Sequence, residues 1–162
     1  ERVKKSVQIY RQHLPDIHLY PEAREVLSKF SRTNALFLVT DGNKLVQSRK
    51  VEDLGISSYF RKIYITHRYG LKASKPSLIC FERIKNLMGV QWKDMIYVGD
   101  NPKKDFVSLK AQGMKTIRVH TGQYREVLAD DMHSADISIS NISCLKHHLV
   151  VSGQNGIEKK LR

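Results

Sequence analysis

The amino-acid sequence predicts an α/β fold in which a mainly parallel sheet is covered by helices on both faces. Short apolar runs, which are typical of buried strands, alternate with segments whose apolar residues recur at helical spacing. Three of the expected helices end in glycine followed by an apolar residue, at Gly55-Ile56, Gly89-Val90 and Gly113-Met114. Glycine is the usual residue just beyond a helix, and alternating strands and helices favour parallel pairing.

The expected elements follow one another with only short connections. Strands are expected at residues 35–39, 62–66, 95–98, 116–119 and 136–140. Helices are expected at residues 3–14 and 21–30, from Asn43 to Gly55, from Pro76 to Gly89, and from Asn101 towards Ala111. Asparagine caps a helix start and proline suits its first turn, which supports these starting points. Residues 149–156 are expected to form a strand and a turn, within either a linker or a disordered tail.

The composition is that of one globular domain with a strong positive charge. The chain has 162 residues and a formal net charge of +12, which raises the question of a nucleic-acid or membrane surface. Because the basic residues are scattered without interleaved aromatics, we do not expect a nucleic-acid partner. No apolar run approaches the ~20 residues of a membrane span, so no membrane partner is expected either. Two distant cysteines, Cys80 and Cys144, favour a reducing, cytoplasmic setting.

Two carboxylates flank the turn that follows the strand at 95–98. Asp100 falls where this strand ends, and Asp105 lies five residues later, in the expected helix. Ligand sites of open α/β sheets lie at the carboxyl ends of the strands, and Mg²⁺ commonly takes one or two carboxylates there. A capped turn with two solvated acids explains the same spacing equally well.

A second polar group is expected at the same edge of the sheet. Thr40, Asp41 and Gly42 end the strand at 35–39, and Lys75 precedes the helix expected at Pro76. A hydroxyl, loop N–H groups and a lysine together suit a phosphate group. Each residue also has a simpler explanation, since Thr40 can cap its turn and Lys75 can be a solvated loop residue.

These segments resemble those of the haloacid dehalogenase-like (HAD) hydrolases. Thr40-Asp41-Gly42-Asn43 is similar to the second motif of the family, and Lys75-Pro76 is similar to the third. The segment from Gly99 to Asp105 is similar to the fourth, and the resemblance covers roughly residues 19–140. It implies a Rossmann-like three-layer α/β/α core. The most similar subgroup contains phosphatases of small phosphorylated metabolites with a helical cap.

The resemblance also implies a role for each candidate residue. Thr40, with the backbone of Asp41 and Gly42, would bind the transferring phosphoryl group, and Lys75 would offset its charge. Asp100 would ligate Mg²⁺, and Asp105 would support the ion directly or through water. Phosphoryl transfer depends chiefly on positioning and charge stabilisation, which such groups supply.

One part of the family pattern is missing. The nucleophile of these enzymes is the first aspartate of an Asp-x-Asp motif on the first strand, and no Asp-x-Asp occurs in these 162 residues. The resemblance places that strand between the one ending at Thr40 and the one ending at Asp100. We therefore expect the end of a helical cap at residues 1–18, a core without its first strand at 19–145, and a tail or linker at 146–162.

The functional expectation follows from these matches and this gap. The complete protein is expected to be a Mg²⁺-dependent phosphomonoesterase that acts through an aspartyl-phosphate, while this chain lacks the nucleophile. The alternative is a catalytically inactive HAD-like binding or interaction module of a larger protein. A receiver domain has less support, because no acidic pair precedes a phospho-accepting aspartate. A partner chain, a further domain or residues 149–152 are the candidates to complete the sheet.

Overall fold

The computed structural model describes residues 16–153, with side chains described up to residue 149. The chain divides into two compact units, and one boundary between them falls inside helix α2 (Pro21–Phe30). Of the described residues, unit 1 contains 16–20 and 27–91, and unit 2 contains 21–26 and 92–153. The helix expected at residues 3–14 lies outside the described residues.

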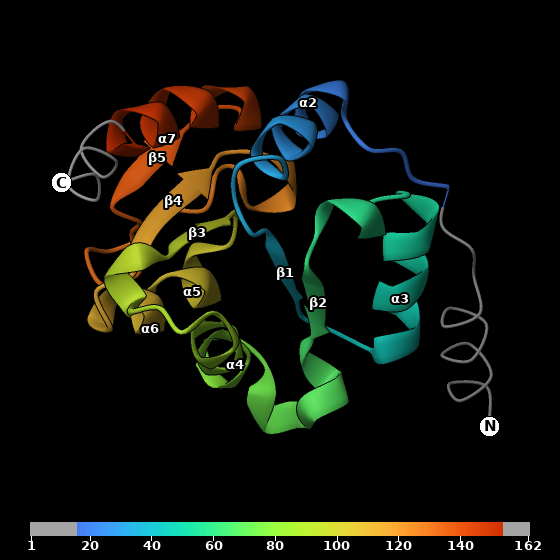
Figure 1. Cartoon of the computed structure of the whole chain (residues 1–162). Coiled ribbons are helices and arrows are strands. Elements are labelled where there is room, and N and C mark those ends of the chain that lie inside the picture. The colour runs from blue at the N-terminus through green and yellow to red at the C-terminus, as the bar shows by residue number, and fades with distance from the viewer. Residues whose placement is uncertain (1–15, 154–162) are drawn as a thin grey trace, which may run out of the picture. The chain divides into compact units, whose positions relative to one another are not determined.

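Unit 1 is built on two parallel strands. β1 (Phe37–Thr40) pairs with β2 (Lys62–Ile65) so that Thr40 lies opposite Ile65 at the carboxyl ends. Helix α3 (Lys44–Asp53) contacts β2 and helix α4 (Ile79–Met88) contacts β1, and the two helices lie on opposite sides of the pair (Figure 1). The buried apolar side chains of this unit are Phe30, Val39, Val51, Ile56, Tyr64, Ile65, Ala73, Cys80, Phe81 and Ile84.

Unit 2 is built on three parallel strands in the order β3 (Ile96–Gly99), β4 (Lys115–Val119) and β5 (Ile137–Ile139). Three helices accompany them: α5 (Pro102–Asp105), α6 (Val107–Ala111) and α7 (Leu145–Gly153). Helices α6 and α7 lie on opposite sides of these strands (Figure 1). The core contains Phe106, Leu109, Met114, Ile117, Val119, Ile139 and Leu145.

The predicted α/β fold with parallel pairing is confirmed, and so are the three glycine helix ends. Gly55, Gly89 and Gly113 have φ values of 62°, 63° and 81°, which glycine adopts without the strain that a Cβ would cause. The next amide donates back into the last turn each time, from Ile56 to Val51, from Val90 to Lys85 and from Met114 to Leu109. These bonds satisfy carbonyl groups that the end of a helix otherwise leaves unpaired.

The helix expected to begin at Pro76 begins instead at Ile79, so that prediction was wrong. The amide of Ser77 donates to the carbonyl of Ser74 at 3.0 Å, which closes a turn around Lys75 and Pro76. Proline suits a tight turn as well as it suits a first helical position, and here the turn prevails.

The continuous helix expected from Asn101 towards Ala111 was also wrong, because the segment forms two short helices. Phe106 separates α5 from α6 with φ −116° and ψ −39°, and its ring is fully buried. Immediately before it, the Asp105 side chain bends back onto the amide of Asn101. The burial of Phe106 and the hydrogen bond of Asp105 outweigh the helical spacing of the apolar residues in this segment.

The strand expected at residues 149–152 is part of helix α7, which corrects the third expectation. The side chain of Asn141 accepts from the amide of Ser143 at 2.8 Å, and the buried Leu145 begins the helix that follows this turn. β-branched residues favour strands only weakly, and packing of the first turn overrides that preference. These residues are therefore not the strand that completes the sheet.

No strand pairs with the second edge of β1 or of β3 among residues 16–153. The strand that the family resemblance places between them stays a prediction, as do the proposed domain bounds.

Burial makes a testable difference between the two free cysteines. Cys80 is fully buried whereas Cys144 is half-buried. Burial raises the pKa of the Cys80 thiol above its ordinary value of 9.0, against a smaller opposing effect of Arg83. We expect a thiol reagent at neutral pH to modify Cys144 at least about tenfold faster than Cys80, because a buried thiol reacts only after local opening.

The single variants Cys80→Ser and Cys144→Ser show which modification rate belongs to which cysteine. In denaturant the two cysteines should react at equal rates. Because the folded-state pKa of Cys80 is raised, its contribution to stability is present below pH 9 and is lost as the pH rises further. Equal rates in the folded chain would contradict this description of the core.

Candidate functional site

In unit 1 the structure joins the two loops that were predicted to bind phosphate. The carboxylate of Asp41, directly after β1, accepts a hydrogen bond from the backbone amide of Lys75 at 3.1 Å. A charged acceptor makes this bond stronger than one between neutral groups. The side chain of Asp41 thereby holds Lys75 next to the end of β1. From the sequence, only the backbone of Asp41 had been considered as part of the phosphate site.

The hydroxyl of Thr40 already has a partner within this unit. It donates to the side-chain carbonyl Oε1 of Gln47 at 3.0 Å. Gln47 lies in the first turns of α3, which Asn43 caps by accepting from the amides of Leu45 and Val46, as predicted. A hydroxyl has one proton to donate, so Thr40 would have to release Gln47 in order to donate to a phosphate oxygen.

In unit 2 the carboxylate of Asp105 fixes the turn that carries Asp100. Asp105 is 2% exposed, and its Oδ2 accepts from the amide of Asp100 at 3.2 Å and from that of Asn101 at 2.9 Å. The Tyr97 hydroxyl donates to the other oxygen at 3.4 Å. Because both oxygens accept protein hydrogen bonds, Asp105 positions the turn rather than offering a free carboxylate.

Gly99 makes this arrangement possible. A Cβ placed on Gly99 would lie 2.6 Å from Oδ2 of Asp105 and 3.0 Å from a ring carbon of Tyr97. Both distances are shorter than any ordinary contact, so a larger residue would push the carboxylate off the turn. The glycine at the end of β3 is needed for space, and its backbone has no positive φ.

Asp100 is the candidate metal ligand of unit 2. It follows β3, and the loop after β4 approaches it at Gly122, where a Cβ would lie 3.9 Å from its Oδ2. Within residues 16–153, no three histidine, cysteine, aspartate or glutamate side chains are grouped to hold an ion together. A single carboxylate with water and substrate oxygens still suits Mg²⁺, which keeps several waters in most protein sites.

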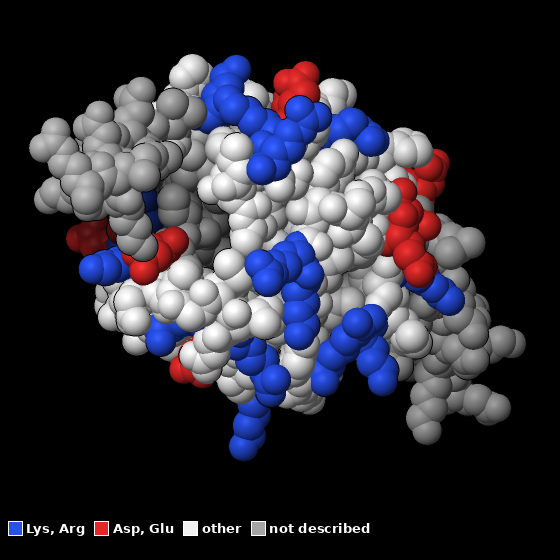
Figure 2. Space-filling view, viewed as in Figure 1, with Lys and Arg blue, Asp and Glu red and all other residues white. Residues whose placement is uncertain are grey.

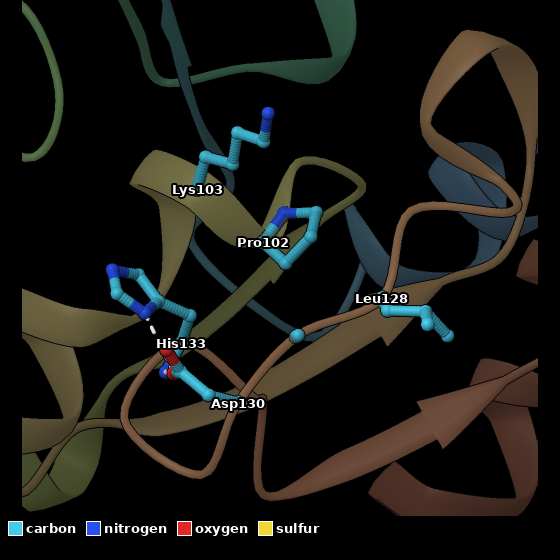
Figure 3. A pocket seen from close by; sticks show the side chains of 6 residues that line it. Pro102, Lys103, Leu128, Asp130 and His133 are labelled. Atoms are coloured by element: carbon cyan, nitrogen blue, oxygen red, sulfur yellow. Dashed lines mark hydrogen bonds and ion pairs between the residues drawn. The ribbon is translucent and has the colours of Figure 1, made fainter.

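A hollow of about 240 Å³ lies beside the start of α5 in unit 2 (Figure 3). It is lined by Pro102, Lys103, Leu128, Ala129, Asp130 and His133. The ring nitrogen Nδ1 of His133 lies 2.7 Å from Oδ1 of Asp130, which also accepts from the His133 amide at 2.9 Å. These two hydrogen bonds hold the pKa of Asp130 below its ordinary value of 3.8, the ring bond having the larger effect.

The loop that forms one wall of this hollow is tied down by two cationic side chains. Arg118 of β4 is 5% exposed and donates from Nη2 to the carbonyls of Tyr124 and Val127, at 2.9 and 2.6 Å. Lys110 of α6 donates to the carbonyl of Ser134 at 2.7 Å. The loop is therefore held by buried and half-buried groups of the unit and not only by its own turns.

On the face shown in Figure 2 the basic side chains do not form one continuous patch. Lysine and arginine side chains stand there in several separate places, with acidic side chains among them. A contiguous basic patch is the usual footprint of nucleic-acid binding. As for membranes, none of the helices within residues 16–153 has the length and apolar character needed for a span.

The structure thus brings together Asp41 with Lys75, and Asp100 with Asp105, each pair within its own unit. Sequence reasoning missed Gln47, Arg118 and the pair of Asp130 and His133. One signal was available for Gln47, since it lies four residues after the helix cap Asn43 and therefore on the same face of the helix as the cap. No sequence signal distinguished Arg118 from the other basic residues.

The buried carboxylate of Asp105 gives a stability prediction. Asp105→Ala removes the acceptor of two amides, and each buried group left unpaired costs about 1–3 kcal/mol. We therefore expect the free energy of unfolding in urea to fall by about 2–5 kcal/mol. The control Asp131→Ala, at an exposed position of the same unit, should change it by less than about 0.5 kcal/mol. Similar values for both variants would show that Asp105 does not organise the turn.

The pair of Asp130 and His133 gives a pH prediction. NMR titration should place the pKa of Asp130 below 3.8, and His133→Ala should raise it, because the bond from the ring is lost. Since the folded-state pKa is lowered, the contribution of this pair to stability is present above pH 3.8 and is lost as the pH falls through the folded-state value. The exposed control His147→Ala should leave the Asp130 titration unchanged, and an equal shift in both variants would contradict the assignment.

The sequence of this chain is similar to those of known phosphatases. The chain is 32% identical over 124 residues to a glyceraldehyde 3-phosphate phosphatase of Methanocaldococcus jannaschii, a match that covers 76% of this chain and 53% of that protein. It is 27% identical over 143 residues to a phosphoserine phosphatase of Thermus thermophilus, covering 88% and 55%. The chain thus spans about half the length of the curated relatives it matches.

Solved structures show the same fold. A 2-haloacid dehalogenase of Pseudomonas syringae matches with a TM-score of 0.75 at 23% identity, over 92% of this chain and 60% of that one. A predicted phosphoglycolate phosphatase of Haemophilus somnus matches with a TM-score of 0.74 at 21% identity, over 90% and 64%. A sequence model described as haloacid dehalogenase-like hydrolase matches residues 1–119, which is most of the chain. The protein therefore belongs to the haloacid dehalogenase-like hydrolase family.

Proposed function

We propose that the complete protein is a Mg²⁺-dependent phosphatase of a small phosphorylated metabolite. The observation that carries this proposal is the hydrogen bond from the Lys75 amide to Asp41, which brings a lysine to the end of the strand that carries Thr40 and Gly42. The named relatives, phosphatases of small phosphorylated compounds, support the substrate class.

The proposed roles divide between the two units. Thr40, the backbone of Asp41 and Gly42, and the Lys75 side chain bind the phosphoryl group and offset its charge. Asp100 would hold Mg²⁺, with Asp105 supporting the turn beneath it. When bound, the ion would supply the positive charge on which phosphoryl transfer depends. We also propose a reducing, cytoplasmic setting, which the free thiols Cys80 and Cys144 support.

We further propose that this chain does not carry the nucleophile. Covalent phosphoryl transfer needs an attacking carboxylate, and the sequence contains no Asp-x-Asp. Asp41 is a poor substitute because its carboxylate is engaged by the Lys75 amide. Asp105 is buried beneath the Asp100 turn, and Asp100 is needed for the ion.

The test uses p-nitrophenyl phosphate with Mg²⁺, on this chain and on the chain extended upstream in its natural reading frame. We expect no turnover by this chain and chelator-sensitive turnover by the extended one. In the extended chain, Lys75→Met should lower kcat by about 10²–10³, as loss of a single charge-stabilising group does. The matched control Lys72→Met removes an exposed lysine of the same loop and should retain activity.

Two outcomes would overturn parts of this proposal. Turnover by the short chain that disappears in Asp100→Ala would show that the nucleophile lies within these 162 residues. An extended chain with an intact Asp-x-Asp but no activity would favour the inactive binding module instead.

A further inference from the structure

Gln47 of α3 lies at the polar end of β1 and has no role in the proposed function so far. Its Oε1 accepts the hydroxyl proton of Thr40 at 3.0 Å. The side chain is half-buried, so it is partly open to an approaching molecule. Its backbone amide donates to the carbonyl of Asn43 at 3.0 Å, which places the residue in the first turns of the helix.

The other end of the Gln47 carboxamide lies over Gly42. A Cβ placed on Gly42 would be 2.9 Å from Nε2 of Gln47, and 3.5 Å from its Cδ and Cγ. Gly42 has φ +130°, a conformation that favours glycine, and a Cβ there would displace the end of the Gln47 side chain. The carboxamide therefore spans the loop, with its oxygen towards Thr40 and its nitrogen against Gly42.

The hydrogen bond with Thr40 determines what this carboxamide offers to a ligand. With Oε1 accepting from the hydroxyl, the Nε2 group carries two N–H donors, and within the described residues it donates to no protein acceptor. The Nε2 group of Gln47 is thus a partly exposed double donor beside a loop that is suited to anions. The proposed function has not yet given it a role.

We propose that the Gln47 carboxamide is a further phosphate-binding group, which Thr40 orients and which donates from Nε2 to a phosphoryl oxygen. This inference rests on the proposed function, because it assigns a residue to the same phosphate-binding loop. It revises one role there: while the Thr40 hydroxyl donates to Gln47, Thr40 orients the carboxamide instead of donating to the phosphate itself. The ligand class is a phosphate monoester or inorganic phosphate, whose oxygens accept several hydrogen bonds at once.

The alternative role of Gln47 has the opposite consequence. If the carboxamide only competed for the Thr40 hydroxyl, its removal would free that hydroxyl to donate to phosphate. Gln47→Met keeps the length of the side chain and removes both polar atoms. It should weaken phosphate binding if Gln47 is a donor, and strengthen binding if Gln47 is a competitor.

The experiment titrates the complete 162-residue chain with inorganic phosphate at constant ionic strength and follows ¹H–¹⁵N spectra. We expect the side-chain amide signals of Gln47 to shift in a saturable way together with the Gly42 amide. Gln47→Met should bind phosphate about tenfold to a hundredfold more weakly, the effect of losing one hydrogen bond to a charged group. The control Gln112→Met, at an exposed position of unit 2, should bind as the unmodified chain does.

The remaining outcomes separate this inference from the proposed function. Saturable shifts at Gly42 with unchanged or tighter binding in Gln47→Met would overturn the donor role and leave the phosphate site intact. Binding elsewhere, or no saturable binding by the unmodified chain, would overturn the donor role and count against the phosphate-binding loop as well. A thermal unfolding scan of Gln47→Met identifies a loss of folding, and in that case Gln47→Glu replaces it. Glutamate still accepts from Thr40 but has no N–H donor, so it should also weaken binding.

Discussion

The structure of unit 2 depends on one buried carboxylate. At the end of β3 the backbone leaves the sheet, and the amides of Asp100 and Asn101 need acceptors that no neighbouring strand supplies. Oδ2 of Asp105 accepts from both, at 3.2 and 2.9 Å. An unpaired amide is costly in a buried turn, so this bond decides where the Asp100 side chain is presented.

The same bond explains features that otherwise look unrelated. Gly99 has no side chain because the carboxylate passes 2.6 Å from where its Cβ would lie. The expected long helix is interrupted because Asp105 turns back towards the strand while Phe106 enters the core. One polar contact thus determines a residue type, a helix end and the position of a candidate metal ligand.

In unit 1 different groups hold the polar loops at the end of the strand. The carboxylate of Asp41 holds the Lys75 amide, and the carboxamide of Gln47 joins Thr40 to Gly42. In both units, the carboxylate of a residue that the sequence analysis named as a candidate site residue accepts hydrogen bonds from backbone amides and so holds a loop in place. Substituting such an acid changes geometry as well as charge, so its catalytic and structural contributions require separate measurements.

The sequence by itself determined the α/β class, the five strands and the residues that collect at their carboxyl ends. Apolar runs, glycine helix ends and capping residues are local signals, and each reflects the conformational preference of a few neighbouring residues. The tertiary structure alone decided which polar groups meet, because the Asp41 carboxylate and the Lys75 amide are 34 residues apart and their contact depends on packing. It also decided that residues 149–152 are helical and that Arg118 is buried, since local preference is weaker than the burial of neighbouring side chains.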